Sequence, residues 1–226
     1  MENNGKKKVG LFGGTFDPVH MGHLRAGEEI REMLGLSEVY FIPSALPPHK
    51  ESSEVTPSRH RLKMLELALD SNPFFEICEY EVEKSSASYT IETLKYLTGL
   101  HADHEFYFIV GNELFSDIET WKDYRELFKL SNFAVITRPG FSNGEPPKPP
   151  LALGADFSYD KNTENVIFYR NKNSKVIAFT QIRGLEVSST EIRRLIKTEK
   201  SIRYLVPGPV EEYIMSNMLY RGEEAQ

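Results

Sequence analysis

The sequence has little cysteine, no long apolar run and no excess of basic residues. Its single cysteine, Cys78, excludes an internal disulfide framework and a zinc site built on cysteines. The apolar run around Cys78 favours a buried strand cysteine over a nucleophile. No stretch approaches the roughly 18 apolar residues of a membrane helix, and the N-terminus lacks the apolar core of a signal peptide. We therefore expect a cytoplasmic protein with no membrane partner.

The net charge of −6 argues against a general nucleic-acid-binding protein, because such proteins usually carry a basic face. A phosphate pocket needs only a few cationic side chains and is compatible with this charge. The chain has 226 residues, of which 40% are apolar, and this suits one α/β domain with a sizeable core. The sequence leaves the oligomeric state open, a homo-oligomer included.

Short apolar runs alternate with helical patterns along the chain. We predict buried strands at residues 9–12, 39–42, 74–78, 106–110 and 133–137, and helices at 22–34, 57–71, 90–97, 124–130 and 209–219. Such alternation indicates a Rossmann-like, doubly wound parallel sheet with helices on both faces, in a single domain. Four of the strands run into the unusual loops GGTFDPVH, PSALPPHK, GNE and RPG, which should meet at one edge of the sheet.

The region around residues 141–180 differs in composition from the rest of the chain. It opens with the proline-rich run GFSNGEPPKPP, and residues 165–170 and 175–180 then form a predicted β-hairpin. We interpret this region as an insertion on the same domain.

The most informative segment is GGTFDPVHMGH, residues 13–23. Glycines directly after a strand let the backbone approach a phosphate, and the helix that follows offers free N–H groups to an anion. His20 and His23 share one face if the helix begins near them, and the pair can donate hydrogen bonds to phosphate oxygens. Three other interpretations are a metal site that includes Asp17, a nicotinamide dinucleotide site, and a tight turn with surface histidines. The glycine spacing disfavours the second, and the combination of features in eleven residues disfavours the third.

These motifs resemble those of the nucleotidyltransferases that carry an H-x-G-H motif. The most similar family is that of the bacterial nicotinate-nucleotide adenylyltransferases. Further matching segments are PPHK at 47–50, SYTIETL at 88–94, the tryptophan of ETWKDY, RPG at 138–140, VSSTEIR at 187–193 and LVPGPVEEYI at 205–214. They follow the family's order along nearly the whole chain.

The resemblance implies transfer of the adenylyl group of ATP to nicotinate mononucleotide by direct in-line attack, without a covalent intermediate. Mg²⁺ would be carried by the ATP phosphates, with no protein metal ligand assigned. The implied catalytic residues are His20, His23 and Lys50. The implied ATP-binding residues are Gly13, Gly14, Thr15, Phe16, His20, Gly22, His23, Ser189, Thr190 and Arg193. The run from Ser188 to Glu191 also reads as a helix start with a capping box, so a plain cap beside a surface arginine is the alternative there.

Acceptor recognition would fall to Thr90, Glu113, Trp121, Lys122 and Arg138. Two of these depart from the family pattern. Glu113 stands where an aspartate is usual, and Lys122 stands where the family commonly has an aromatic residue. These changes concern the acceptor and leave the phosphate-handling residues intact. The competing functions are the same chemistry on nicotinamide mononucleotide, phosphopantetheine or an alcohol phosphate, and a nucleotide sensor without catalysis.

Overall fold

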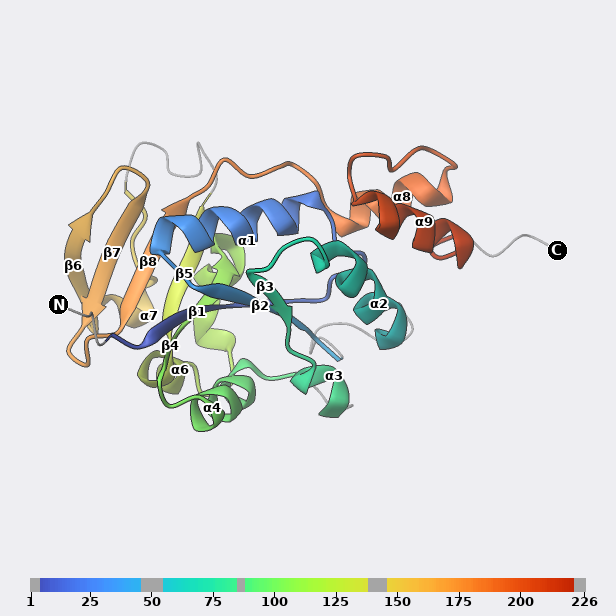
Figure 1. The fold of residues 1–226 in the computed structure, drawn as a ribbon. Helices are drawn as coiled ribbons and strands as arrows, with labels where there is room; N and C mark the ends of the chain where they lie inside the picture. The colour runs from blue at the N-terminus through green and yellow to red at the C-terminus, as the bar shows by residue number, and fades with distance from the viewer. Residues whose placement is uncertain (1–4, 46–54, 85–87, 138–145, 222–226) are drawn as a thin grey trace.

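The structure is a computed structural model that describes residues 5–45, 55–84, 88–137 and 146–221 (Figure 1). One eight-stranded sheet has the order β3-β2-β1-β4-β5-β8-β7-β6. The strands are β1 (Lys7–Gly14), β2 (Glu38–Pro43), β3 (Phe75–Ile77), β4 (His104–Gly111), β5 (Asn132–Thr137), β6 (Phe157–Asn162), β7 (Val166–Asn171) and β8 (Val176–Gln181). The helices are α1 (Met21–Leu34), α2 (Ser58–Leu69), α3 (Tyr80–Lys84), α4 (Thr90–Leu100), α5 (Asn112–Ser116), the 3₁₀-helix η2 (Ile118–Thr120), α6 (Tyr124–Leu130), α7 (Leu151–Gly154), α8 (Ser189–Lys197) and α9 (Gly208–Ser216).

The strands from β3 to β8 in this order are parallel. The chain winds outward from β1 through β2 to β3, and then crosses to β4 on the other side of β1. The predicted doubly wound α/β sheet is therefore confirmed. The sheet lies between two layers of helices, with α1 on one face and α4 and α6 on the other (Figure 1). Both faces of the central strands are covered, which explains why these strands are apolar runs and do not alternate.

Each face of the sheet has its own apolar core. On one face Phe12, Phe41 and Ile109 pack with α1, α2, α8 and α9. On the other, Leu11 and Phe108 pack with α4, α5 and α6. The helix α9 packs against α2, and α8 lies next to α9 (Figure 1). The last described segment of the chain reaches the loop after β1, where Tyr220 contacts Asp17.

The predicted hairpin forms, but it belongs to the main sheet. β7 and β8 pair antiparallel, and β8 pairs parallel with β5. The sequence interpretation missed β6, an edge strand of sequence FSYDKN that is exposed after Phe157. From Phe157 on, the region around 141–180 is therefore a continuation of the sheet, and its interpretation as an insertion on the same domain stays a prediction.

Cys78 is partly buried one residue beyond β3, in contact with the second core. Burial raises the pKa of its thiol, so the side chain is a poor nucleophile, as expected. Among the described residues, no helix has both the length and the apolar character needed to cross a bilayer.

Candidate active site

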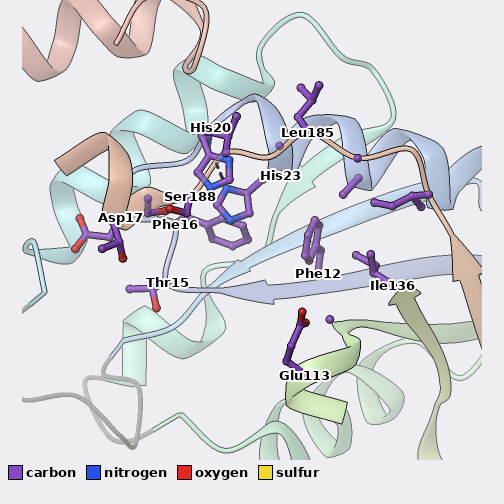
Figure 2. Close-up of a pocket in the computed structure, with 18 of the residues that line it drawn as sticks. Phe12, Thr15, Phe16, Asp17, His20, His23, Glu113, Ile136, Leu185 and Ser188 are labelled. Atoms are coloured by element: carbon purple, nitrogen blue, oxygen red, sulfur yellow. Dashed lines mark hydrogen bonds between the residues drawn. The ribbon is translucent and has the colours of Figure 1, made fainter. Parts of the chain in front are cut away.

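A cavity of about 420 Å³ lies at the carboxyl ends of β1 and β4, where the chain turns from one half of the sheet to the other. Ligands of open parallel sheets bind at such switch points. Figure 2 shows how residues from the β1–α1 loop, the start of α5 and the β8–α8 segment face one another there. The lining consists of Phe12, Thr15, Phe16, Asp17, His20, Gly22, His23, Ala26, Gly111, Asn112, Glu113, Ile136, Ile182, Gly184, Leu185, Val187, Ser188, Ser189, Thr190 and Arg193.

His20 and His23 stand at the start of α1, as the sequence predicted. His20 is the N-cap residue, and its extended backbone turns the chain into the helix. The two imidazole rings stack with their centroids 3.6 Å apart (Figure 2). The backbone N–H of His20 donates to Nδ1 of His23 over 3.3 Å. Because this Nδ1 accepts, the hydrogen of the neutral His23 ring lies on Nε2.

Burial holds both imidazoles neutral at pH 7. It lowers the pKa of His20 to about 4 and the pKa of His23 well below its usual value of 6.5. Nδ1 of His20 is shielded from solvent and has no hydrogen-bond partner within the described part of the chain. A neutral imidazole still donates one hydrogen bond, so the pair can bind anionic oxygens without adding a full charge.

The glycines of this segment make room for aromatic rings. A Cβ added at Gly22 would lie 3.0 Å from Nδ1 of His20, and one at Gly14 would lie 3.0 Å from the Phe16 ring. Phe16 itself is buried with a left-handed backbone, at a φ of 50°, and packs edge-on against the ring of His23. Glycine at position 22 of the H-x-G-H motif therefore lets the His20 ring lie against the helix backbone. Gly13 and Gly14 end β1 and are not among the lining residues, so their contact with phosphate stays a prediction.

The start of α8 lines the cavity beside the loop that leads to His20 (Figure 2). Ser188 is the N-cap, and its Oγ accepts from the backbone N–H of Glu191 over 3.1 Å, as the capping pattern predicted. The Glu191 carboxylate pairs with Arg194, so the reciprocal half of the capping box is not made. Ser189 donates to the carbonyl of Pro18 over 2.9 Å, and these contacts bring the N–H groups of a second helix start to the cavity.

Arg193 also lines the cavity from α8. Its Nη1 donates to the carbonyl of Asp17 over 2.6 Å, and its Nη2 contacts Oγ1 of Thr190 over 3.4 Å. The guanidinium is thus placed next to the loop that leads to His20. A positive charge and two helix N-termini around one cavity favour an anionic ligand.

The metal interpretation of this loop is not supported by the position of Asp17. Its carboxylate is buried and accepts from the Tyr220 hydroxyl over 2.6 Å and from the backbone N–H of Thr56 over 3.1 Å. Within the described residues, the group of side chains close enough to hold one ion is His101, Asp103 and His104, at the amino end of β4. That group lies at the other end of the strand from Gly111 and the cavity.

A model of the cytidylyltransferase-like family matches residues 11–195, which include the cavity walls. The chain belongs to this family. Similar curated proteins are named probable nicotinate-nucleotide adenylyltransferase. The one from Syntrophotalea carbinolica is 39% identical over 218 residues, covering 96% of this chain and 99% of the relative. The one from Bacillus pumilus is 36% identical over 216 residues, covering 96% and 100%. These relatives confirm the resemblance to the nicotinate-nucleotide adenylyltransferases that the motifs indicated.

Solved structures agree with the architecture. Two are Plasmodium falciparum nicotinic acid mononucleotide adenylyltransferase, complexed with APC in one and with NaAD in the other. Both superpose with a TM-score of 0.69 and cover 95% of this chain and 97% of their own, at 21% and 22% identity. At this level of identity the likeness concerns the fold.

Of the predicted acceptor residues that the structure describes, one lines the cavity and three do not. Glu113 reaches into the cavity from the start of α5, across from the two histidines (Figure 2). Thr90 begins α4, and the half-buried Trp121 packs edge-on against Phe108 at 5.9 Å, but neither lines the cavity. Lys122 also lies outside the lining.

Lys122 is engaged in local contacts. Its Nζ pairs with Glu92 over 3.0 Å and lies 4.4 Å from the centroid of the Tyr89 ring. The hydrogen bond to Glu92 raises the pKa of the lysine. Two further predicted site residues, Lys50 and Arg138, lie outside the described residues.

Sequence reasoning missed two buried polar residues, one that lines the cavity and one that lies behind the loop after β1. Asn112 is buried beside Glu113 and lines the cavity. Arg61 is buried in α2 behind the loop after β1. A signal for Arg61 was present, because it continues the apolar face formed by Met64, Leu65 and Ala68, where a charged residue is unexpected.

Proposed function

We propose that the chain transfers the adenylyl group of ATP to nicotinate mononucleotide, forming nicotinate adenine dinucleotide and pyrophosphate in NAD biosynthesis. The observation that carries this proposal is the neutral pair His20 and His23, which lines one cavity together with Arg193 at the switch point of the sheet. The full-length curated relatives bear the name of this activity.

The proposed reaction is a direct in-line displacement. A phosphate oxygen of nicotinate mononucleotide attacks the α-phosphorus of ATP, the bond from that phosphorus to the β-phosphate oxygen breaks, and pyrophosphate leaves. The attacking phosphate is already anionic at neutral pH, so the step needs neither a general base nor a covalent nucleophile. Catalysis then consists of positioning and of stabilising the charge that develops on the phosphoryl oxygens.

The His20 and His23 rings are proposed to donate hydrogen bonds to the triphosphate. The Nε2–H of His23 is available because its Nδ1 is already used inside the helix start. Arg193 and the first N–H groups of α8 would bind the phosphates from the adjoining start of α8, with Ser189 and Thr190 beside them. Since the donors come from helix starts, they are ordered before the substrate arrives.

Mg²⁺ is part of the proposal, bound chiefly by the ATP phosphates. Two carboxylates line the cavity. Asp17 is fully engaged by Tyr220 and Thr56, while the exposed Glu113 could accept from a metal-bound water. This donor set fits an ion that keeps its waters and phosphate ligands better than one held by a protein cage. When bound, Mg²⁺ would neutralise charge on the phosphates.

The decisive experiment measures pyrophosphate release from Mg-ATP with nicotinate mononucleotide and nicotinamide mononucleotide in parallel. We expect turnover with the acid, a strong preference over the amide, and the dinucleotide as product by mass spectrometry. Preference for the amide would identify nicotinamide mononucleotide as the acceptor and leave the proposed adenylyl transfer unchanged. Absence of turnover with both, and with phosphopantetheine, would contradict adenylyl transfer to these acceptors and favour a nucleotide sensor.

The role of Trp121 is tested by the substitution Trp121→Ala. If the ring helps to bind the pyridine, the KM for nicotinate mononucleotide should rise about tenfold, as for loss of one aromatic contact of about 1.4 kcal/mol, while the KM for ATP stays nearly unchanged. Steady-state kinetics with each substrate varied in turn give both values. Equal losses for the two substrates would instead assign Trp121 a structural role through its contact with Phe108.

A cytoplasmic location also belongs to this proposal, because the reaction draws on ATP. Cell fractionation with an antibody against the chain would test it. The chain is proposed to work without nucleic-acid or membrane partners, and light scattering would decide between a monomer and a homo-oligomer.

A further inference from the structure

Arg61 is the largest charged side chain in the core, and only 1% of its surface is exposed. Its guanidinium donates to three backbone carbonyls: Nη1 to Thr15 over 2.9 Å, Nε to Thr56 over 2.8 Å and Nη2 to Ala45 over 3.2 Å. Burying a charged group is costly unless its donors are satisfied. The three carbonyls therefore fix the position of the Arg61 side chain, and the guanidinium in turn fixes the position of the three carbonyls.

The three carbonyls belong to separate parts of the chain. Thr15 follows β1 and begins the loop that leads to His20, Ala45 follows β2, and Thr56 precedes α2. A planar guanidinium can serve three carbonyls in a fixed fork, whereas the compact ammonium of lysine cannot match that geometry. Arg61 thus sets the position of the loop after β1 relative to β2 and α2.

Asp17 closes the same network from the other side. Its carboxylate accepts from the backbone N–H of Thr56 and from the hydroxyl of Tyr220, near the end of the described chain. Burial lowers the pKa of the Arg61 guanidinium, and the Asp17 carboxylate opposes that effect. The Arg61 guanidinium, the Asp17 carboxylate and the Tyr220 hydroxyl therefore fix one side of the turn from Thr15 to Asp17.

Two hydrogen bonds from α8 also hold this turn. Arg193 donates to the Asp17 carbonyl, and Ser189 donates to the Pro18 carbonyl. Only His20 and Val19 then separate this braced turn from the start of α1. A shift of the turn must be transmitted to the His20 ring, which has little freedom because it packs between Gly22 and His23.

We propose that Arg61 is a positioning residue that holds the loop from Thr15 to Asp17, and through it the rings of His20 and His23, in the geometry needed for adenylyl transfer. The catalytic part of this inference rests on the function proposed above. An apolar side chain would fill the same space on α2 without the cost of burying a charge, but it would leave the three carbonyls without donors. The arginine at this site is thus explained by the position it imposes on the loop.

The kinetic test compares Arg61→Lys with Arg31→Lys, a matched control. Arg31 lies in α1, away from the cavity, and pairs with Glu28. Misplacing reacting groups by about 1 Å costs about 10²-fold in rate. We expect Arg61→Lys to lower kcat per folded protein about 10²-fold, with the KM for nicotinate mononucleotide within about twofold, and Arg31→Lys to change neither. An unchanged kcat, measured well below the melting temperature, would show a merely structural arginine and overturn the proposal.

A second measurement does not depend on activity. Imidazole ¹⁵N chemical shifts of all histidines are recorded for the wild type and for Arg61→Lys. The proposal requires the His20 and His23 signals to move while those of His101 and His104, at the amino end of β4, stay in place. Unchanged His20 and His23 signals would overturn the positioning role. If the wild type turns over no acceptor but the shifts move as expected, the proposed function fails and the positioning of the loop stands.

Should Arg61→Lys fail to fold, Tyr220→Phe removes a single hydroxyl donor from the same network. It should lower kcat several-fold and move the His20 and His23 signals in the same direction, to a smaller extent. No change in either readout from this variant would count against the network as a whole.

Discussion

Two histidine pairs with the same spacing occupy opposite ends of this molecule. His20 and His23 begin α1 at the carboxyl end of β1, whereas His101 and His104 follow α4 at the amino end of β4. Both pairs stack, with ring centroids 3.6 Å and 4.6 Å apart. The spacing of the histidines alone therefore does not distinguish the two sites.

The surroundings of the pairs do distinguish them. The first lies at a helix start, where free N–H groups favour anions, and it lines the same cavity as Arg193. The second follows a helix end, where carbonyls accumulate, and has Asp103 beside it. A helix start at the carboxyl edge of a parallel sheet turns a stacked histidine pair into a candidate phosphate site.

The largest expected contrast is in turnover. His23→Ala removes a donor aimed at the phosphates and should lower kcat by about 10²–10³-fold, as for the loss of one transition-state donor. His104→Ala removes the equivalent member of the other pair and should leave kcat within about twofold. Pyrophosphate release under saturating substrates measures both. The contrast would collapse if the two variants lost similar activity, or if His23→Ala weakened ATP binding alone.

The first pair should also make stability depend on pH. The folded-state pKa of His20 is about 4, below the usual 6.5, so between these values the unfolded chain binds more protons. Stability is then complete above about pH 6.5 and falls as the pH drops towards 4, by about 1.4 kcal/mol per pH unit for one such histidine. Urea unfolding of the wild type and of His20→Asn at pH 7 and pH 5 isolates this contribution. A free-energy difference between the two that is the same at both pH values would show that His20 titrates normally.

The sequence predicted the site best where neighbouring residues alone determine the local structure. The run from Gly13 to His23 contains its own strand end, turn and helix start, so its placement follows from short-range rules. Ser188 at the start of α8 is a similar case. The central strands were also predicted from the sequence, because strands buried on both faces are apolar throughout.

Prediction failed where long-range contacts decide. The edge strand β6 is polar and exposed after Phe157, so nothing local marks it, and pairing with β7 makes it a strand. Arg61 continues the apolar face of α2 in the sequence, but its partners are three carbonyls that only the folded chain brings to it. Lys122 and Trp121 follow α5 and η2 in sequence and lie outside the cavity lining, so their roles toward the acceptor stay predictions.

The smallest expected contrast concerns the glycine beside each histidine pair. Gly22 lies in the first turn of α1, and an added Cβ there would meet Nδ1 and Cε1 of His20 at 3.0 and 3.1 Å. Gly99 lies near the end of α4, and an added Cβ there would meet nothing within 4 Å. Gly22→Ala should therefore push the His20 ring by a few tenths of an ångström and lower kcat by roughly tenfold or less, by the sensitivity of rate to position.

Gly99→Ala should keep the wild-type kcat and raise the free energy of unfolding by up to about 0.5–1 kcal/mol, because alanine loses less backbone entropy than glycine in a helix. Kinetics and urea unfolding on the two variants give both quantities. A Gly22→Ala protein with wild-type kcat would mean that the His20 ring can yield without cost. Gly22 would then be needed for the start of α1 and not for the position of the His20 and His23 rings. The two histidine pairs would then differ only in their location at opposite edges of the sheet.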